Sequence, residues 1–224
     1  MPLSRKQIAW RAAQDLGDGT YVNLGIGLPT LVADVLPDNR EIVLQSENGV
    51  LGVGPAPGAN EIDMDLVNAG KQPVTLLKGG SYVHHTDSFL MIRGQHLDYA
   101  LLGAFEVAEN GDLANWTTDD PKFPPGVGGA MDLAAGAQHV FVTLEHTDSH
   151  GNPKLVERCG YPLTMPNCVD AVITDLALLR RPDRASRFVL EEVAAGFSVE
   201  EVLSLTGMTV DVADEVGVMQ ENWG

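Results

Sequence analysis

The chain carries one carboxylate in a position suited to covalent chemistry. The tetrapeptide Ser46-Glu47-Asn48-Gly49 follows the apolar run IVLQ (residues 42–45), which predicts a short buried strand. Asn48 and Gly49 both tolerate positive φ, so they predict a tight turn. Glu47 is therefore expected at the C-terminal tip of a strand, where open α/β sheets place ligands and catalytic groups. A glutamate before Asn-Gly is also typical of a solvated turn, and the tetrapeptide alone leaves both interpretations open.

Three glycine-rich segments add places where backbone N–H groups could approach a ligand. They are Gly25-Ile26-Gly27, Gly79-Gly80 and Gly126-Val127-Gly128-Gly129, all interpreted as turns, and the last leads into a predicted helix. A helix N-terminus adds partial positive charge suited to an oxyanion or a phosphate. The first segment lacks the third glycine of a dinucleotide fingerprint, and no Gly-Lys-Ser/Thr of a P-loop is present. Tight turns alone also explain each segment.

The histidines offer further candidates. His84 and His85 follow a predicted strand and a Gly-Gly turn, so they could bind an anionic group or a metal. Adjacent residues point in different directions, however, and no carboxylate lies at ligand spacing. His146, Asp148 and His150 also suggest a metal, but a polar loop that caps a strand explains them better. We expect no bound metal, and no Gly-x-Ser-x-Gly elbow supports a serine hydrolase.

The composition describes an acidic chain with enough apolar residues for a sizeable core. Of 224 residues, 44% are hydrophobic, and 14 Lys and Arg oppose 31 Asp and Glu, which gives a formal charge of -17. A chain of this length and composition predicts a single domain over residues 1–224. Its charge repels nucleic acid and anionic membranes, so neither is expected as a partner. Solubility explains the acidity better than an acidic interaction surface does.

The cysteines and the N-terminus bear on location. Cys159 and Cys168 are too few for a disulfide framework and lack the paired spacing of a zinc site, so we expect buried thiols in a reducing compartment. The N-terminus has no uninterrupted apolar segment of a secretion signal, and no apolar stretch reaches the roughly 18 residues that span a bilayer. The expectation is a soluble cytoplasmic protein.

Apolar strands alternate with short helices along the chain. Ser4 and Gln7 form a capping box before an apolar helical face that ends at Gly17. Strands are predicted at 20–24, 42–45, 74–78, 97–107, 139–146 and 168–179, and helices at 30–36, 87–93, 131–135 and 199–205. This alternation predicts an α/β fold with an open, mostly parallel sheet and helices on both faces.

Taken together, the motifs resemble a known family. YVNLGIGLPT, SENG, GPAPG, LVNAGK, HHTDSFLMIRG, LLGAFEV, GDLANW, GVGGAMDLAAGA, EHTDSHGNPKLVERC and YPLT occur in the order and at nearly the spacing typical of the B (beta) subunit of family I 3-oxoacid CoA-transferases. The resemblance runs from about residue 20 to residue 179 and implies a Rossmann-like CoA-transferase fold. Within the family, HHTDSFLMIRGQHLD is most similar to the 3-oxoadipate branch, since the succinyl-CoA:acetoacetate enzymes usually carry small residues in place of the two histidines.

The resemblance also implies a reaction and roles for named residues. CoA would move from succinyl-CoA to a 3-oxoacid, most closely 3-oxoadipate, by a ping-pong route in which Glu47 forms an acyl anhydride and then a glutamyl-CoA thioester. The family places a backbone N–H at the oxyanion that corresponds to Gly129, with Gly128 beside it. Asn23 and Lys71 correspond to family residues that contact CoA. No metal or organic cofactor is implied, because the CoA thioester is itself a substrate.

A partner is implied as well. Family enzymes pair this chain with an A (alpha) subunit of similar size that supplies substrate contacts, so we expect an A2B2 or larger assembly and no transferase activity from this chain alone. His84 and His85 are hypothesised to hold the distal carboxylate of 3-oxoadipate. Three alternatives stay open: the beta subunit of a succinyl-CoA:acetoacetate CoA-transferase, a CoA-ester hydrolase that uses Glu47, and a non-catalytic sensor of a small acid or sugar phosphate.

Overall fold

The fold is built on one large mixed sheet with a smaller sheet beside it. The computed structural model describes residues 1–37, 39–118 and 125–219. The large sheet consists of β1 (Thr20–Leu24), β2 (Ile42–Ser46), β3 (Val50–Val53), β4 (Leu76–Tyr82), β5 (Tyr99–Gly103), β8 (His139–Thr143), β10 (Ala171–Ile173), β11 (Ala177–Arg180), β12 (Val189–Ala194) and β13 (Asp211–Met219). The small sheet consists of β6 (Glu106–Ala108), β7 (Leu113–Ala114) and β9 (Leu155–Val156). The helices are α1 (Arg5–Gln14), the 3-10 helix η1 (Leu28–Asp34), α2 (His85–Arg93), α3 (Ala130–Gly136) and α4 (Val199–Ser204).

The strand order explains where the C-terminal strand ends meet. The large sheet runs β13-β12-β11-β10-β8-β5-β1-β2-β3-β4, and its middle strands from β10 to β2 are all parallel. Antiparallel strands extend it on both sides, at β3 and β4 and at β11 and β12. The predicted open sheet with a parallel centre is confirmed, and the C-terminal ends of four neighbouring strands, β8, β5, β1 and β2, share one edge.

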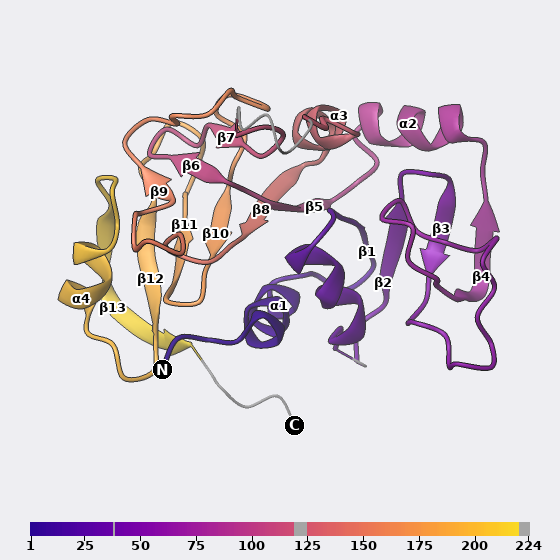
Figure 1. Cartoon of the computed structure of the whole chain (residues 1–224), viewed down its shortest axis with the longest axis horizontal. Helices are drawn as coiled ribbons and strands as arrows, with labels where there is room; N and C mark the ends of the chain where they lie inside the picture. Colours follow the sequence, from indigo (N-terminus) through magenta and orange to yellow (C-terminus); the bar gives the residue numbers. More distant parts are fainter. Residues whose placement is uncertain (38, 119–124, 220–224) are drawn as a thin grey trace.

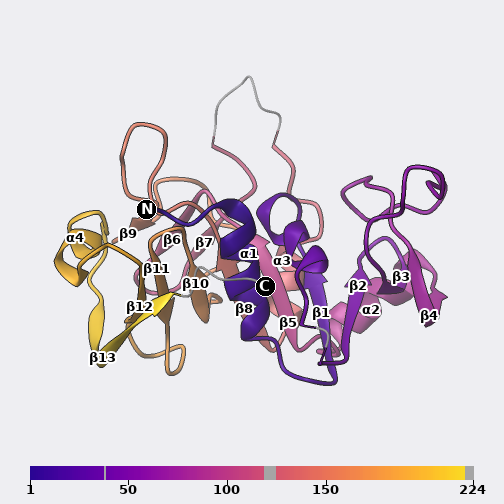
Figure 2. The ribbon, with the colours of Figure 1, turned by 90° about the horizontal axis from the view of Figure 1, so that it is seen from below.

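Helices cover both faces of this sheet, as predicted. Successive side chains of a strand point to opposite faces, and in β5 Leu102 packs into a cluster with Ile92 of α2, whereas Leu101 packs into a second cluster with Ile8 of α1. Figures 1 and 2 show α1 and η1 on one side of the sheet and α2 and α3 on the other. The apolar runs of the central strands therefore bury both of their faces.

The first helix begins at the predicted capping box. The Ser4 hydroxyl accepts the N–H of Gln7 at 3.4 Å, and Gln7 Oε1 accepts the N–H of Ser4 at 2.8 Å. Near the end of α1, Arg11 donates to Asp15 at 2.9 Å and to Glu192 of β12 at 2.8 Å. These half-buried ion pairs tie the helix to the antiparallel part of the sheet.

Two of the predicted strands are each divided in the structure. The predicted strand 97–107 is β5 and β6, which belong to different sheets, and the chain leaves the large sheet between them. The predicted strand 168–179 is the antiparallel pair β10 and β11, joined by a turn in which Thr174 Oγ1 accepts the N–H groups of Leu176 and Ala177. The connecting residues, 104–105 and 174–176, include neither glycine nor proline, so no turn residue marks either break.

Other predictions differ in their boundaries. The predicted turn at Gly79-Gly80 is wrong, because both glycines lie inside β4, where a side chain at Gly80 would press on the backbone of Leu51 in β3. The glycines allow this close approach beside a register shift between β3 and β4. The helix predicted at 30–36 is η1, which begins earlier at Leu28. Strands β3, β7, β9, β12 and β13 were not predicted from the sequence.

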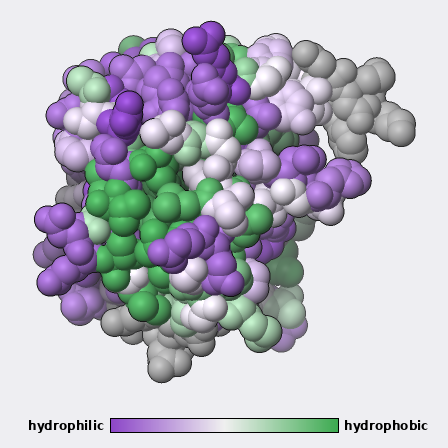
Figure 3. Space-filling model, turned by 90° about the vertical axis from the view of Figure 1, so that its left-hand side faces the viewer, coloured by the Kyte–Doolittle hydropathy of each residue, from purple (hydrophilic) through white to green (hydrophobic). Residues whose placement is uncertain are grey.

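Both edges of the large sheet carry exposed apolar side chains. At one edge β13 exposes Val212 and Val218, and Figure 3 shows apolar side chains gathered at this end of the molecule. At the other edge β4 exposes Leu77 and Tyr82. Among the described helices, none has the length and apolar character to cross a membrane.

The packing on both faces predicts a large difference between two leucines. Leu101→Ala should lower the free energy of unfolding by about 2–5 kcal/mol, because it leaves a cavity where the side chain is fully buried. Leu77→Ala, on an exposed edge strand, should change it by at most about 0.5 kcal/mol. Urea denaturation of both variants measures the difference, and equal losses would contradict this account of the core.

Candidate active site

Glu47 is the first residue of the tight turn that joins β2 to β3. The N–H of Gly49 donates to the carbonyl of Ser46 at 2.9 Å and closes the turn. Gly49 adopts a φ of 115°, and a side chain there would collide with the carbonyl of Val83. The predicted turn at Asn48-Gly49 is confirmed, and Glu47 lies directly beyond the C-terminal end of β2.

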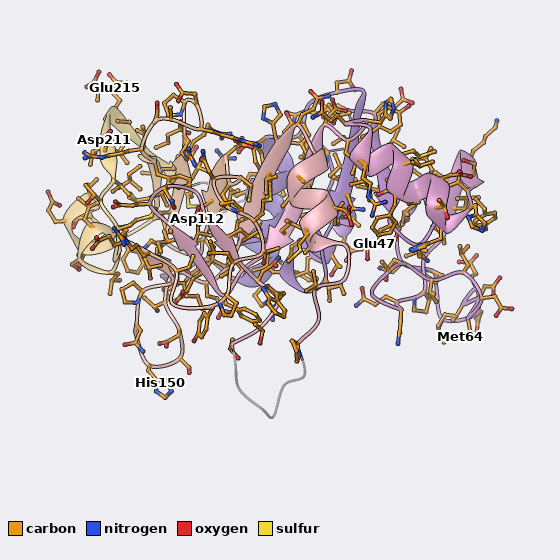
Figure 4. All side chains as sticks on the ribbon, turned by 90° about the horizontal axis from the view of Figure 1, so that it is seen from above. Glu47, Met64, Asp112, His150, Asp211 and Glu215 are labelled. Carbon is orange, nitrogen blue, oxygen red and sulfur yellow. The ribbon has the colours of Figure 1, made fainter. Side chains whose placement is uncertain are left out.

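The Glu47 carboxylate lies close to the start of α3. Gly129, the N-cap residue of α3, donates its backbone N–H to this carboxylate. A side chain at position 129 would overlap the carboxylate and press on Phe89 of α2. Figure 4 shows Glu47 beside the two helices. Glycine at this position therefore lets the beginning of α3 approach the acid at contact distance.

The environment changes the acidity of Glu47. Burial of the half-exposed side chain raises the pKa of its carboxyl above the ordinary value, and the negative charge of Asp132 adds to this effect. The His85 side chain and the Gly129 N–H act in the opposite direction, because both stabilise the carboxylate. The net result is a raised pKa, which makes the ionised form a stronger base and a stronger nucleophile than a carboxylate in water.

Glu47 faces a pocket of about 510 Å³ that follows the C-terminal edge of the parallel strands. The lining includes Asn23 of β1, Thr143 of β8 and the loops that follow β1 and β5. Two of the predicted glycine segments, at 25–27 and 126–129, form part of the wall. The pocket therefore brings together Glu47, Gly128, Gly129 and Asn23, which are far apart in the sequence.

Asn23 is almost completely buried in the pocket wall. Its side-chain Nδ2 donates to the backbone carbonyl of Gln45 at 3.1 Å and to Gln45 Oε1 at 2.5 Å. Gln45 in turn donates to the hydroxyl of Ser88 in α2 at 2.6 Å. This chain of buried hydrogen bonds links β1, β2 and α2 directly behind Glu47, so Asn23 positions the strand that carries the acid.

Lys71 lies outside the lining of the pocket, at its rim. It is exposed, has a φ of 62°, and closes a turn in which its N–H donates to the carbonyl of Asn68 at 2.9 Å. The turn is held beside the acid, because Ala69 donates its N–H to the hydroxyl of Ser46 at 2.9 Å. The exposed ammonium of Lys71 is therefore available to a ligand that extends out of the pocket.

The two adjacent histidines lie at the start of α2 and have different surroundings. His84 is the N-cap residue, and its Nδ1 accepts the N–H of Thr86 at 3.2 Å. His85 stacks on Phe89, with ring centroids 4.8 Å apart, and its charge acts on Glu47. Neither histidine is among the described residues that line the pocket. The structure thus brings His85 near the acid and gives His84 a structural role at the helix end.

Three pocket residues were missed by the sequence reasoning. Arg5, Thr143 and Lys154 line the same pocket as Glu47. Thr143 is the last residue of a parallel strand, as Ser46 is in the strand before Glu47, and this shared position is the signal that could have found it. Arg5 and Lys154 come from a helix start and a loop with no local motif, so only the fold reveals them.

The residues considered for a metal are dispersed. His146 is fully buried, its ring nitrogens bond the hydroxyls of Thr174 and Thr206, and burial lowers its pKa to about 4. His150 is exposed on the loop tip seen in Figure 4, next to Asp148, which accepts the N–H of His150 at 2.8 Å. The polar loop is confirmed for residues 148–150, whereas His146 belongs to the core. Within the described residues, no group of three or more possible ligands could hold a metal ion.

The cysteines lie away from Glu47. Cys168 is fully buried, as predicted, whereas Cys159 is only half-buried. Burial raises the pKa of each thiol to about 12, so neither is a reactive thiolate at neutral pH.

The raised pKa of Glu47 predicts a pH-dependent stability difference. A group with a raised pKa in the folded state favours folding at low pH, and this contribution is lost as the pH rises through that pKa. Glu47→Gln removes the buried charge and keeps an oxygen that can accept the Gly129 N–H. The variant should therefore resist urea better than the wild type at pH 7, and the difference should shrink toward pH 4. A difference that grows on acidification would contradict the raised pKa.

Comparison with known proteins adds a family context to this geometry. The profile of the coenzyme A transferase family matches residues 5–205. The B chain type of the Acinetobacter baylyi 3-oxoadipate CoA-transferase, one of its two named subunits, is 53% identical over 93% of this chain and 95% of its own length. A Bacillus subtilis protein, named as the probable B-type subunit of a succinyl-CoA:3-ketoacid coenzyme A transferase, is 46% identical over 96% of this chain and 99% of its own.

A solved structure shares the fold. The acyl-CoA transferase YdiF of Escherichia coli O157:H7 superposes with a TM-score of 0.72 at 19% identity. The match covers 99% of this chain but 44% of that one, so the chain spans less than half the length of this structural relative.

Proposed function

Because the chain belongs to the coenzyme A transferase family, we propose that it is the beta subunit of an enzyme that moves CoA from succinyl-CoA to a 3-oxoacid, with 3-oxoadipate as the acceptor. The observation that carries the proposal is the contact between the Glu47 carboxylate and the Gly129 N–H inside a pocket of about 510 Å³. The choice of acceptor is supported by 53% identity to a protein whose name specifies 3-oxoadipate.

In the first half-reaction the acyl group leaves CoA for Glu47. The carboxylate attacks the thioester carbonyl of succinyl-CoA, and collapse of the tetrahedral intermediate expels CoA thiolate and leaves a mixed anhydride on Glu47. The thiolate then attacks the glutamyl carbonyl, which releases succinate and leaves a glutamyl-CoA thioester. The raised pKa of Glu47 supports this role, because a more basic carboxylate is a better nucleophile.

In the second half-reaction the acceptor reverses these steps. Its carboxylate attacks the glutamyl thioester, which gives a new anhydride and free thiolate, and the thiolate then attacks the acyl carbonyl to form 3-oxoacyl-CoA and regenerate Glu47. Each exchange passes through a tetrahedral carbon on Glu47 itself. The Gly129 N–H already faces an oxygen of that carbon, so we assign it to the oxyanion formed at the glutamyl carbonyl.

Other groups in the proposal bind CoA and complete the site. We assign the exposed Lys71 at the pocket rim to a CoA phosphate, and Asn23 to the wall beside the reacting thioester. Gly128 precedes the oxyanion donor with a φ of 53°, which aims the chain into α3. No cofactor takes part, since CoA is a substrate, and an alpha subunit in an A2B2 or larger assembly supplies the remaining contacts, as the names of the relatives suggest.

Two related activities are separable by assay. The Bacillus subtilis relative is named for 3-ketoacids in general, so acetoacetate is the second candidate acceptor. A comparison of kcat/KM for 3-oxoadipate and acetoacetate decides between them. Hydrolysis of succinyl-CoA with no acceptor present would instead support a CoA-ester hydrolase that uses the same glutamate.

Glu47→Gln should abolish transfer while the protein stays folded. With the alpha subunit co-expressed, the rate should fall by at least roughly 10³-fold, because the amide cannot form the covalent intermediate. Incubation of the wild-type complex with succinyl-CoA should add the mass of CoA to the peptide that contains Glu47, and the variant should show no adduct. The exposed Glu200→Gln in α4 is the matched control and should behave as wild type. An active Glu47→Gln complex would refute the proposed mechanism.

Gly129→Ala should lower kcat by roughly 10²- to 10³-fold, because the new methyl group displaces Glu47 from the N–H donor. Gly126→Ala in the same loop is the matched control, since a side chain there meets no atom within 4 Å. Steady-state kinetics of the two complexes measure the contrast. Equal activity of both variants would remove Gly129 from the reaction.

A further inference from the structure

The pocket extends from Glu47 to the end of β8, three strands away. The strand order β8-β5-β1-β2 and the usual spacing of neighbouring strands place these two ends roughly 14 Å apart. Thr143, Lys154 and Arg5 line the far end. Glu47 and these three side chains therefore enter one continuous space from opposite sides.

Thr143 has an unusual hydroxyl. The residue is 1% exposed, and its Oγ1 is the buried side-chain oxygen or nitrogen without a hydrogen-bond partner among the described residues. A buried hydroxyl without a partner costs free energy, so such groups point to a missing ligand. Asn115, another polar residue of the pocket wall, has both ends of its amide bonded, to Gly103 and Thr164. The polar group left for a ligand is at the β8 end.

Two cations accompany this hydroxyl. Lys154 is half-buried, and its backbone is fixed by hydrogen bonds to His146 and Val107, both of 3.0 Å. Neither Lys154 nor the exposed Arg5 makes a side-chain hydrogen bond or an ion pair with a described residue. Uncommitted cations are scarce in a chain with 14 Lys and Arg against 31 Asp and Glu.

The charge of the pocket changes during the proposed reaction. Its described lining carries two cations, Arg5 and Lys154, and two carboxylates, Glu47 and Glu145. Conversion of Glu47 into an anhydride or a thioester removes one negative charge, so the covalent enzyme has a net positive pocket. An anionic group of the substrate is then attracted to the end where the cations lie.

We propose that Lys154 and Thr143, with Arg5 beside them, bind the distal carboxylate of dicarboxylic substrates and so select 3-oxoadipate over monocarboxylic 3-oxoacids. The inference rests on the proposed function, in which one carboxyl group of the acid reacts at Glu47. Succinate and 3-oxoadipate both carry a second carboxylate at the other end of the chain. Lys154 supplies the charge and Thr143 donates its unpaired hydroxyl hydrogen.

Kinetics with two matched acceptors test the assignment on the co-expressed two-subunit complex. 3-Oxohexanoate has the same six-carbon chain as 3-oxoadipate but lacks the distal carboxylate. Lys154→Met should lower kcat/KM for 3-oxoadipate by roughly 10- to 100-fold and leave 3-oxohexanoate within about twofold. Thr143→Val should lower the 3-oxoadipate value by roughly 2- to 10-fold. Lys78→Met, an exposed lysine on β4, is the control and should leave both values unchanged.

Three outcomes would overturn the assignment. Equal losses with both acceptors that disappear when succinyl-pantetheine replaces succinyl-CoA would assign Lys154 to a CoA phosphate. A selective loss of 3-oxoadipate in a His84→Ser/His85→Ser variant, with none in Lys154→Met, would place the carboxylate at α2 instead. Destabilisation of Thr143→Val without a kinetic effect would make Thr143 structural. A wild-type complex that transfers CoA to neither acceptor refutes the proposed function itself.

Discussion

The site depends on the direct contact between a carboxylate at one strand end and the first backbone N–H groups of a helix. Glu47 and Gly129 can touch only because position 129 has no side chain and because Gly49 turns the chain sharply after the acid. The contact has two opposing effects. Bringing α3 and α2 over the acid removes water and raises its pKa, whereas the Gly129 N–H stabilises its ionised form. The carboxylate therefore stays reactive in a place where an unsupported charge would be neutralised.

The parallel centre of the sheet determines what else can reach this acid. Four parallel strands end at one edge, so Asn23, Glu47 and Thr143 occupy equivalent positions on strands that are distant in sequence. The buried hydrogen bonds from Asn23 through Gln45 to Ser88 couple β1, β2 and α2 behind the pocket. A shift of any of these elements would move Glu47 relative to Gly129, so the core behind the site has to be rigid.

The sequence predicted those parts of the fold that local signals specify. The capping box at Ser4, the strand end at Glu47 and the turn at Gly49 each depend on a few neighbouring residues, and the structure confirms them. The break between β5 and β6 and the hairpin between β10 and β11 carry no such signal, because neither connection contains a glycine or a proline. Arg5 and Lys154 could not be found either, because only tertiary packing brings a helix start and a distant loop to one pocket.

The exposure of the site bears on the role of a second polypeptide. Glu47 remains half-exposed in this chain, and its pocket opens along the strand ends. An anhydride or thioester on Glu47 would be hydrolysed if water reached it freely, so efficient transfer requires the pocket to be closed during the reaction. The described part of the chain has α2, α3 and the turn at 68–71 around the acid, but these do not bury it completely. Closure by a partner would explain both the open pocket and the division of relatives into subunits, since it makes water exclusion, and hence the covalent chemistry, a property of the assembled enzyme.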